Sequence, residues 1–304
     1  FAALLFVAPV CGLVVIKMHG PQIEHDAIAN LEAIASLKCR RLESWLAERY
    51  NDSVILMASE TLRVKVAALR QAGDAGLRES VLASLAAAVD HLQYHSVLLV
   101  DPEGRTQAAL GGVSVVEAEI VSVLAKALES GRPQLSEFIA DEDGGTRLGL
   151  VVPLIDGEQG FRNPLGAVIL HVRPDDFLFP YIQDWPTVSP SGETLLVRRD
   201  GDSLLFLNKL RHRQAAALSL RIPMSRTDLV GVKALEAARP GSGVGVDYRG
   251  VPVFAAYRPV DDTGWMIVAK IDRDEVLLDV GYKTEGVIPS RELSIKHDVD
   301  PNEV

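Results

Sequence analysis

The same order of predicted elements occurs twice along this chain of 304 residues. Two strands joined by an Asp-Gly turn are predicted over 194–208, and an earlier hairpin with an Asp-Pro-Glu-Gly turn is predicted over 96–112. A helical pattern follows each hairpin, at 115–129 and at 228–238, and further strands follow each helix. The order hairpin, helix, antiparallel strands predicts an α+β fold with an internal duplication.

Each half is therefore expected to form one domain. The first is predicted over 73–188 and the second over 189–279, with a proline-rich connector before the boundary near Ser189. The order of elements is that of a PAS-like arrangement, a sheet with helices on one face and a pocket between them, although the pattern also allows other small α+β folds. The later strands are predicted at 147–155, 165–172, 245–248, 251–259 and 265–271.

A long helix is predicted ahead of the first domain. From Asp26 to Leu69 the pattern is helical, with no Pro or Gly between Pro21 and Gly73, which predicts an unbroken stalk over 20–72. Polar residues, Lys38 among them, are expected on the other faces. The apolar stripe could pack on the chain's own domain or form a homodimer with a second subunit. It consists of Ile28, Leu31, Ala35, Cys39, Leu42 and Leu46.

The first residues predict a membrane attachment. Residues 1–16 carry no charge, and a membrane span requires about 20 apolar residues, so 1–19 is interpreted as a span whose start is missing. The core of a signal peptide is the alternative, although no clear small-x-small cleavage site follows.

Composition excludes some classes of protein. The net charge of −10 argues against a nucleic-acid partner, because such a surface needs clustered Lys and Arg. Cys11 lies in an apolar segment and Cys39 in a helical one, and the two are not expected to bond to each other.

Several local sequences carry a family resemblance. The segment SEFIAD at 136–141 and the strand LGAVILHV at 165–172 are similar to motifs of the double Cache extracellular sensor domain of bacterial receptors. The segments 189–213 and 245–276 resemble its membrane-proximal half, as found in sensors attached to PAS modules, histidine kinases or diguanylate cyclases. The resemblance covers about residues 1–278, and it implies a location in the inner membrane of a bacterium with the sensor domain in the periplasm.

The resemblance implies a receptor input rather than an enzyme. A small-molecule ligand would bind the membrane-distal half and change the stalk, which requires that it bind two stalk arrangements with different affinity. No nucleophile elbow, phosphate loop or dinucleotide fingerprint occurs in the sequence. The alternatives are a membrane-anchored periplasmic enzyme and a solute-binding protein.

The candidate ligand-binding residues are Phe138, Asp141, Arg147 and His171. In amine-binding members of the family an Asp ends the strand that His171 ends here, and the Arg-x-Trp-Tyr amino-acid motif is absent. A protonated His171 supported by Arg147 would favour an anion, so a small carboxylate is the predicted ligand. The alternative is that His171 is a hydrogen-bonded strand-end histidine and that Arg147 faces water.

No metal or cofactor is predicted. The acidic turn 141–145 lacks the ligand spacing of a calcium loop, and the pair His91 and His95 stands where a helix is expected to end. In the second half, Asp247, Tyr248, Tyr257 and Trp265 are interpreted as core and edge packing.

The tail 280–304 does not fit the receptor account directly. A family member would cross the membrane again here, but this segment is polar. The chain is therefore expected either to be part of a longer or altered protein or to signal through a partner.

Overall fold

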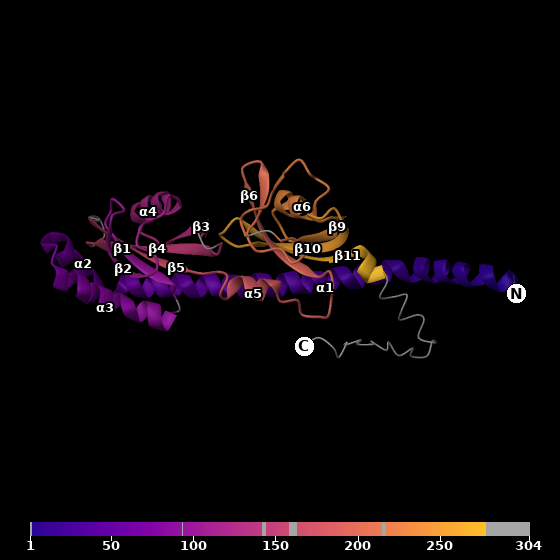
Figure 1. The fold of residues 1–304 in the computed structure, drawn as a ribbon, viewed down its shortest axis with the longest axis horizontal. Coiled ribbons are helices and arrows are strands. Elements are labelled where there is room, and N and C mark those ends of the chain that lie inside the picture. Colours follow the sequence, from indigo (N-terminus) through magenta and orange to yellow (C-terminus); the bar gives the residue numbers. More distant parts are fainter. Residues whose placement is uncertain (1, 93, 142–143, 158–162, 215–216, 278–304) are drawn as a thin grey trace, which may run out of the picture.

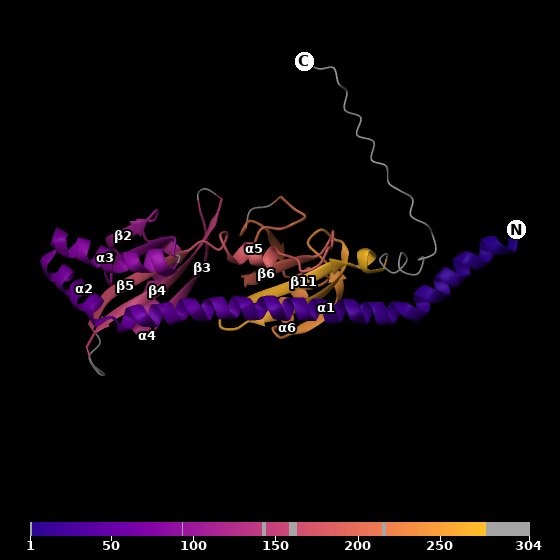
Figure 2. The ribbon, with the colours of Figure 1, turned by 90° about the horizontal axis from the view of Figure 1, so that it is seen from below.

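The structure is a computed structural model with an α+β fold, in which one long helix runs beneath two antiparallel sheets (Figure 1). The two sheets lie one after the other along this helix, and both pack against the same side of it (Figure 2). The structure describes residues 2–92, 94–141, 144–157, 163–214 and 217–277, with side chains described over 21–86 and from Tyr94 onward within these ranges.

The long helix α1, Ala2–Ala58, packs on the chain's own sheets. Of the predicted stripe, Leu31 to Leu46 are buried and Ile28 is partly buried against the same core, so this stripe is a contact within the chain. The prediction of an unbroken helix is wrong, because α1 ends before Ser59 and α2, Glu60–Ala72, begins after it. Ser59 is extended and its side chain accepts a hydrogen bond from the Leu62 amide at 3.3 Å, as an N-cap does.

The first sheet has five strands in the order β2-β1-β5-β4-β3. Helix α4 covers one face, and α1, α2 and α3 cover the other (Figures 1 and 2). Both predicted strands and the predicted hairpin are present, whereas β3 was not predicted as a strand. The elements are α3 (Ala75–Leu92), β1 (Ser96–Val100), β2 (Thr106–Gly111), α4 (Ala118–Ser130), β3 (Gln134–Ala140), β4 (Thr146–Asp156) and β5 (Asn163–Val172).

The second sheet has six strands in the order β8-β7-β6-β11-β10-β9, with α6 on one face and α1 on the other. The predicted hairpin, helix and last two strands are present, β9 lies earlier than predicted, and α5 and β8 were not predicted. The elements are α5 (Leu178–Gln183), β6 (Glu193–Asp200), β7 (Ser203–Phe206), β8 (Arg221–Pro223), α6 (Val230–Ala237), β9 (Gly241–Val246), β10 (Pro252–Val260) and β11 (Trp265–Asp272).

The two sheets share one pairing pattern around their central strands. In the first sheet β5 lies between β1 and β4, and His171 of β5 pairs with Ser96 and Gly149. In the second sheet β11 lies between β6 and β10, and Lys270 of β11 pairs with Glu193 and Ala255. His171 and Lys270 therefore occupy corresponding positions. Alternation along each strand puts both on the face away from α1, which α4 or α6 covers.

Aromatic side chains join the two sheets. The Phe138 ring of β3 lies 4.7 Å from the Trp265 ring of β11 and 5.7 Å from the Phe179 ring of α5, measured between centroids. All three belong to the apolar cluster that continues along α1 beneath both sheets. An ion pair between Arg198 and Glu137, at 3.1 Å, adds a polar contact between β6 and β3.

The connector between the sheets is fixed to α1 by Lys38. This residue was expected on a polar face, but it is buried, and its ammonium donates hydrogen bonds to the carbonyls of Tyr181, Ile182 and Asp184 at the C-terminus of α5. A cation is favourable there because the last carbonyls of a helix have no partner within it. Burial lowers the pKa of Lys38 to about 8, against the opposing effect of the Asp184 charge.

Two predictions fall outside the described side chains. Residues 2–19 of the predicted span are helical, but their side chains are not described, and the tail 280–304 lies outside the described residues. In the part of the chain whose side chains are described, no helix has the length and apolar character that a bilayer crossing requires. Cys39 is a free, buried thiol, and Cys11 lies outside this part.

Candidate functional site

An open pocket of about 450 Å³ lies on the α4 side of the first sheet. It is formed by the loop between β2 and α4 together with the ends of β3, β4 and β5. Both apolar and charged side chains line it. Its lining residues are His95, Gly112, Val113, Ser114, Val115, Glu117, Asp141, Arg147 and Arg173.

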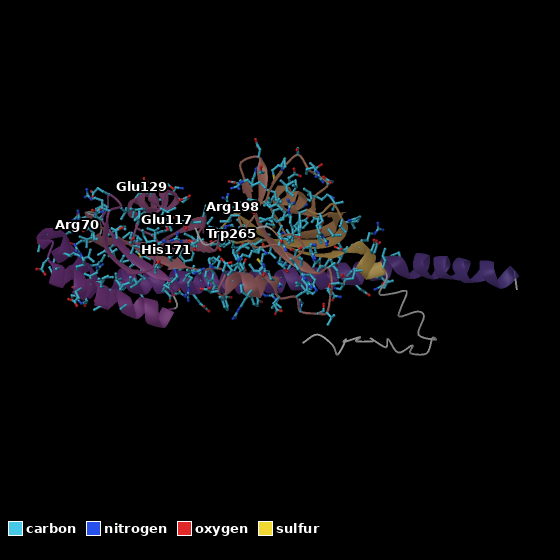
Figure 3. The ribbon with its side chains drawn as sticks, viewed as in Figure 1. Arg70, Glu117, Glu129, His171, Arg198 and Trp265 are labelled. Carbon is cyan, nitrogen blue, oxygen red and sulfur yellow. The ribbon has the colours of Figure 1, made fainter. Side chains whose placement is uncertain are left out.

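Glu117 reaches this pocket because of where α4 begins. The predicted helix start at 115 would have made Glu117 a residue of the first turn. The helix begins instead at Ala118, and Glu117 is extended, with φ −69° and ψ 149°. Its side chain is directed toward the sheet, where Figure 3 shows it close to His171.

Three of the charged residues in the pocket wall form an ionic chain. Arg147 of β4 lies between two carboxylates: its Nη1 is 3.1 Å from Oε1 of Glu117, and its Nε pairs with Asp141 at the end of β3. All three side chains are between 12% and 17% exposed, so a solute in the pocket can reach them. Because Arg147 already pairs with two carboxylates, an anionic ligand must compete with one of them.

His171 lies beneath this chain and does not line the pocket. It is fully buried, with Nε2 3.6 Å from Oε2 of Glu117 and Nδ1 3.0 Å from Oγ of Ser96. A neutral imidazole has one donor and one acceptor nitrogen. With a proton on Nε2 facing the carboxylate, Nδ1 accepts a hydrogen bond from the Ser96 hydroxyl. His171 thus connects the pocket wall to the central strand.

The Glu117 carboxylate lies between the Arg147 guanidinium and the His171 ring. Among the described residues, neither of its oxygens receives an aligned hydrogen bond, and 3.6 Å is too long for one to His171. Burial acts to raise the pKa of Glu117, but His171 and Arg147 together outweigh it and hold the pKa below its usual value. The group is therefore ionised at neutral pH and loosely fixed.

Gly149 leaves space for α4 beside His171. Gly149 pairs with His171 across the sheet, and its amide donates a hydrogen bond to Oγ of Ser136 at 2.8 Å. A Cβ at this position would lie 2.7 Å from Cδ1 of Ile120, a residue of α4. The absence of a side chain allows α4 to approach the sheet beside the histidine.

The structure brings three of the four predicted site residues together. Asp141 and Arg147 line the pocket, and His171 contacts it through Glu117. Phe138 lies elsewhere, because its ring faces α1 and packs against Trp265 and not into the pocket. Ser96, Glu117 and Arg173 are among the residues of the site that no sequence pattern indicated, and His95 was considered only as a metal ligand.

No metal centre is found among the described residues, where no three His, Cys, Asp or Glu side chains are grouped to hold an ion. His95 lines the pocket, whereas the side chain of His91 is not described. The turn after Asp141 includes two residues outside the described part.

The chain matches the family described as Cache domain over residues 20–280. This match covers most of the sequence, and the chain belongs to that family. Cache domains of this kind are sensor domains, and the α+β fold with a long N-terminal helix and antiparallel sheets agrees with the assignment.

Solved structures with the same fold include sensor domains of receptors. The ligand-binding domain of the Pseudomonas aeruginosa PAO1 amino-acid chemoreceptor PctC, in complex with GABA, is 20% identical and has a TM-score of 0.54, over 81% of this chain and all of that one. The corresponding domain of PctB with L-Arg is 16% identical with a TM-score of 0.52, over 87% of this chain and all of that one. The extracellular domain of the histidine kinase candidate rpHK1S-Z16 is 15% identical with a TM-score of 0.57, over 83% and 97% of the two chains. At these identities the likeness concerns the fold.

A different match is short. Over 37 residues, 12% of this chain, the sequence is 89% identical to the small ribosomal subunit protein bS1 of Mycolicibacterium smegmatis. The chain spans about 8% of the length of that curated relative. The family match ends at residue 280, so residues 281–304 lie outside it.

Proposed function

We propose that this chain is the extracytoplasmic sensing region of a bacterial transmembrane receptor, and that it binds a small molecule in the pocket beside α4. Its family consists of non-catalytic sensor domains. The residues that line the pocket suit ligand binding, and they include no nucleophile paired with a general base. The output is proposed to be a histidine kinase or a diguanylate cyclase in the cytoplasm, with the sensing region in the periplasm.

The chain is further proposed to be a double Cache region. Each sheet with its short helix would form one PAS-like domain, over 73–188 and over 189–279. The matching registers around β5 and β11 support this duplication. The first residues would cross the membrane, and exposed parts of α1 would pair with a second copy.

The observation that carries the ligand proposal is the connection between the pocket and the sheet. Arg147 and Asp141 can be reached from the pocket, and Glu117 links Arg147 to His171 on the central strand. A ligand that pairs with Arg147 changes how Arg147 holds Glu117, which is the carboxylate that the buried histidine faces. Such a difference between the free and bound arrangements is what a ligand-driven shift requires.

We propose a small carboxylate as the ligand class. Its carboxylate would replace Asp141 on the Arg147 guanidinium, because Asp141 is adjacent to the turn between β3 and β4 and can move without opening the core. The valine side of the pocket, Val113 and Val115, would contact the apolar part of the ligand.

A thermal-shift screen of the 304-residue chain tests this proposal. The panels are small carboxylates, amino acids, amines and nucleobases, since a ligand that binds the native state raises the unfolding midpoint. Carboxylates are expected to raise it, and Arg147→Met is expected to abolish the rise while Arg258→Met, a change on β10, leaves it intact. A rise with another class contradicts the carboxylate assignment. No rise with any class, or an equal rise in both variants, contradicts the pocket.

A further inference from the structure

The second sheet holds a buried ammonium group where the first sheet holds His171. Lys270 is fully buried on the α6 side of β11. Its Nζ lies 2.8 Å from Oδ2 of Asp247 and 3.0 Å from Oε2 of Glu193, and 5.4 Å from the centre of the Tyr248 ring. Two carboxylates and an aromatic ring around one ammonium are the contacts that a bound amine would make.

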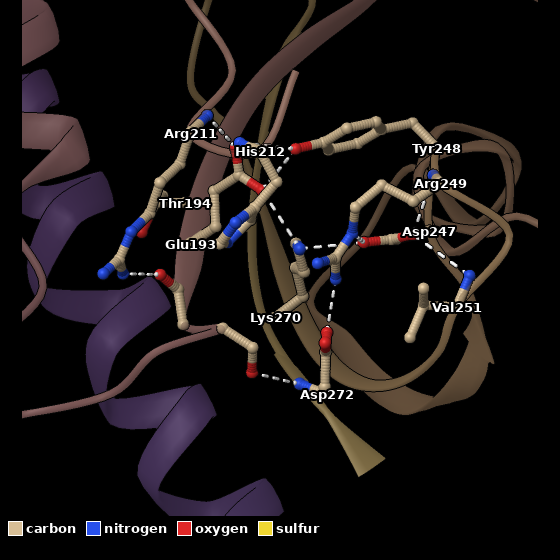
Figure 4. Close-up of polar contacts among 12 residues, drawn as sticks. Glu193, Thr194, Arg211, His212, Asp247, Tyr248, Arg249, Val251, Lys270 and Asp272 are labelled. Carbon is tan, nitrogen blue, oxygen red and sulfur yellow. Dashed lines mark hydrogen bonds and ion pairs between the residues drawn. The ribbon is translucent and has the colours of Figure 1, made fainter. Parts of the chain in front are cut away.

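Other groups hold these carboxylates independently of Lys270 (Figure 4). Glu193 accepts hydrogen bonds from the Tyr248 hydroxyl at 2.9 Å and from the Arg211 amide at 2.6 Å. Asp247 accepts from the Arg249 amide at 2.8 Å and from Nε of Arg249 at 2.6 Å. The two carboxylates are therefore aimed at the ammonium position by their own partners, as in a preorganised binding site.

The charges show why an ammonium group belongs there. Glu193 and Asp247 are 2% and 0% exposed, and buried carboxylates are costly unless a cation and hydrogen bonds compensate them. The Arg249 guanidinium offsets Asp247 and also pairs with Asp272 at the end of β11. Without Lys270, Glu193 would keep only neutral hydrogen-bond donors, the Arg211 amide and the Tyr248 hydroxyl. One more positive charge is therefore needed to compensate the two carboxylates.

We propose that this cluster is a primary-ammonium binding site that the chain's own Lys270 occupies. The α6 side of the second sheet is thereby closed to external ligands at this position, while the corresponding position in the first half borders an open pocket. When the lysine is shortened to alanine, a three-carbon alkylammonium has the size and charge of the atoms removed. This inference concerns the second sheet alone and does not depend on which ligand the first half binds.

Chemical complementation tests the proposal. The unfolding midpoint of the 304-residue chain is measured for wild type and for Lys270→Ala in propylammonium chloride, tetramethylammonium chloride and sodium chloride of equal concentration, and in n-propanol. The variant is expected to have a lower midpoint, and propylammonium alone is expected to raise it in a saturable way. Wild type is expected to unfold at the same midpoint in all three salts.

The controls separate a site from a general salt effect. Lys126→Ala removes an exposed lysine of α4 and is expected to behave as wild type. Lys270→Ala combined with Asp247→Asn removes one carboxylate and is expected to lose most of the response to propylammonium.

Every other outcome overturns the proposal. If Lys270→Ala is unfolded in sodium chloride, its far-ultraviolet circular dichroism is expected to return with propylammonium, and a spectrum that stays unfolded refutes the site. An equal rise with tetramethylammonium or n-propanol, a rise in wild type, or no rise at all also refutes it.

Discussion

The two sheets differ clearly at the corresponding positions that His171 and Lys270 occupy. Beside β5, the chain Glu117, Arg147 and Asp141 is partly exposed, borders an open pocket, and is joined to His171 across 3.6 Å. Beside β11, Lys270 is fully buried and lies within 3.0 Å of two carboxylates. One framework thus supports a loosely held polar site in the first half and a closed one in the second.

The two sites differ in exposure. Asp141 and Glu117 can be reached from the pocket beside Arg147, whereas Glu193 and Asp247 are buried around Lys270. The strand β11 leads directly into the last described segment, where Arg273 contacts Glu24 of α1 at 3.4 Å. The side chain at a single strand position, His171 or Lys270, distinguishes the two.

The largest expected effect comes from breaking the closed site. Lys270→Met leaves two buried carboxylates without their shared cation, and we expect the free energy of unfolding to fall by about 3–5 kcal/mol. Urea unfolding measures this, with Lys126→Met as the exposed control, which is expected to change it by less than about 0.5 kcal/mol. A loss below about 1 kcal/mol for Lys270→Met would mean that the carboxylates do not need the lysine.

A second result sharpens this prediction. The triple variant Lys270→Met, Glu193→Gln, Asp247→Asn removes all three charges together, and it is expected to recover most of the stability that the single variant loses. If the triple variant is less stable than Lys270→Met alone, the loss comes from packing and not from unpaired charge.

An intermediate effect is expected in the open site. Glu117→Gln removes the charge between Arg147 and His171, and we expect it to lower the free energy of unfolding at pH 7 by about 1–3 kcal/mol. The pKa of Glu117 is below its usual value in the folded chain, so its contribution is complete above the unfolded pKa, about 4.3, and is lost as the pH falls through the folded pKa.

The measurement is urea unfolding of wild type and Glu117→Gln from pH 7 to pH 3. The difference between the two curves is expected to be greatest near pH 7 and to shrink below about pH 4.3. A difference that stays constant over this range would show that the ionised carboxylate has no stabilising role.

The smallest effects are expected at Gly149 and Ala255, which pair with His171 and Lys270 on the neighbouring strands. Gly149→Ala puts a methyl group against the tip of Ile120, which can move, and about 1 kcal/mol of destabilisation is expected. The reciprocal change Ala255→Gly in the second sheet is expected to cost a similar amount, because it removes a buried methyl group and loosens a strand. Thermal unfolding measures both, and an increase in stability for Gly149→Ala would show that α4 does not need this close approach.

Much of the fold could be predicted because its signals are local. Asp-Gly and Asp-Pro-x-Gly turns define the two hairpins, and apolar spacing defines the buried stripe of α1. The break at Ser59 was missed because no proline or glycine marks it, although a serine before Glu60 is a usual N-cap. Helix α5 was missed because it contains Pro180 within a proline-rich connector.

The site could be predicted only in part, because partners distant in sequence define it. The family resemblance indicated His171, and Arg147 was chosen from the neighbouring strand, but an error of three residues in the start of α4 hid Glu117. Asp247 and Tyr248 were interpreted as packing, whereas they form hydrogen bonds within a buried ionic cluster.

Lys270 gave no sequence signal of its own. A lysine near the end of a strand normally reaches water. The burial of Lys270 depends on Glu193, which is distant in the sequence but lies on the neighbouring strand of the sheet. Only the assembled sheet shows this pairing.

The central claim is that a solute enters the first half and not the second. Hydrogen–deuterium exchange of the 304-residue chain, with and without a mixture of acetate, propionate, lactate and succinate, tests it directly. We expect slower exchange at 112–117 and at 144–149, and unchanged exchange in the turn 247–251. Protection at 247–251, or no protection near the pocket, would contradict the account.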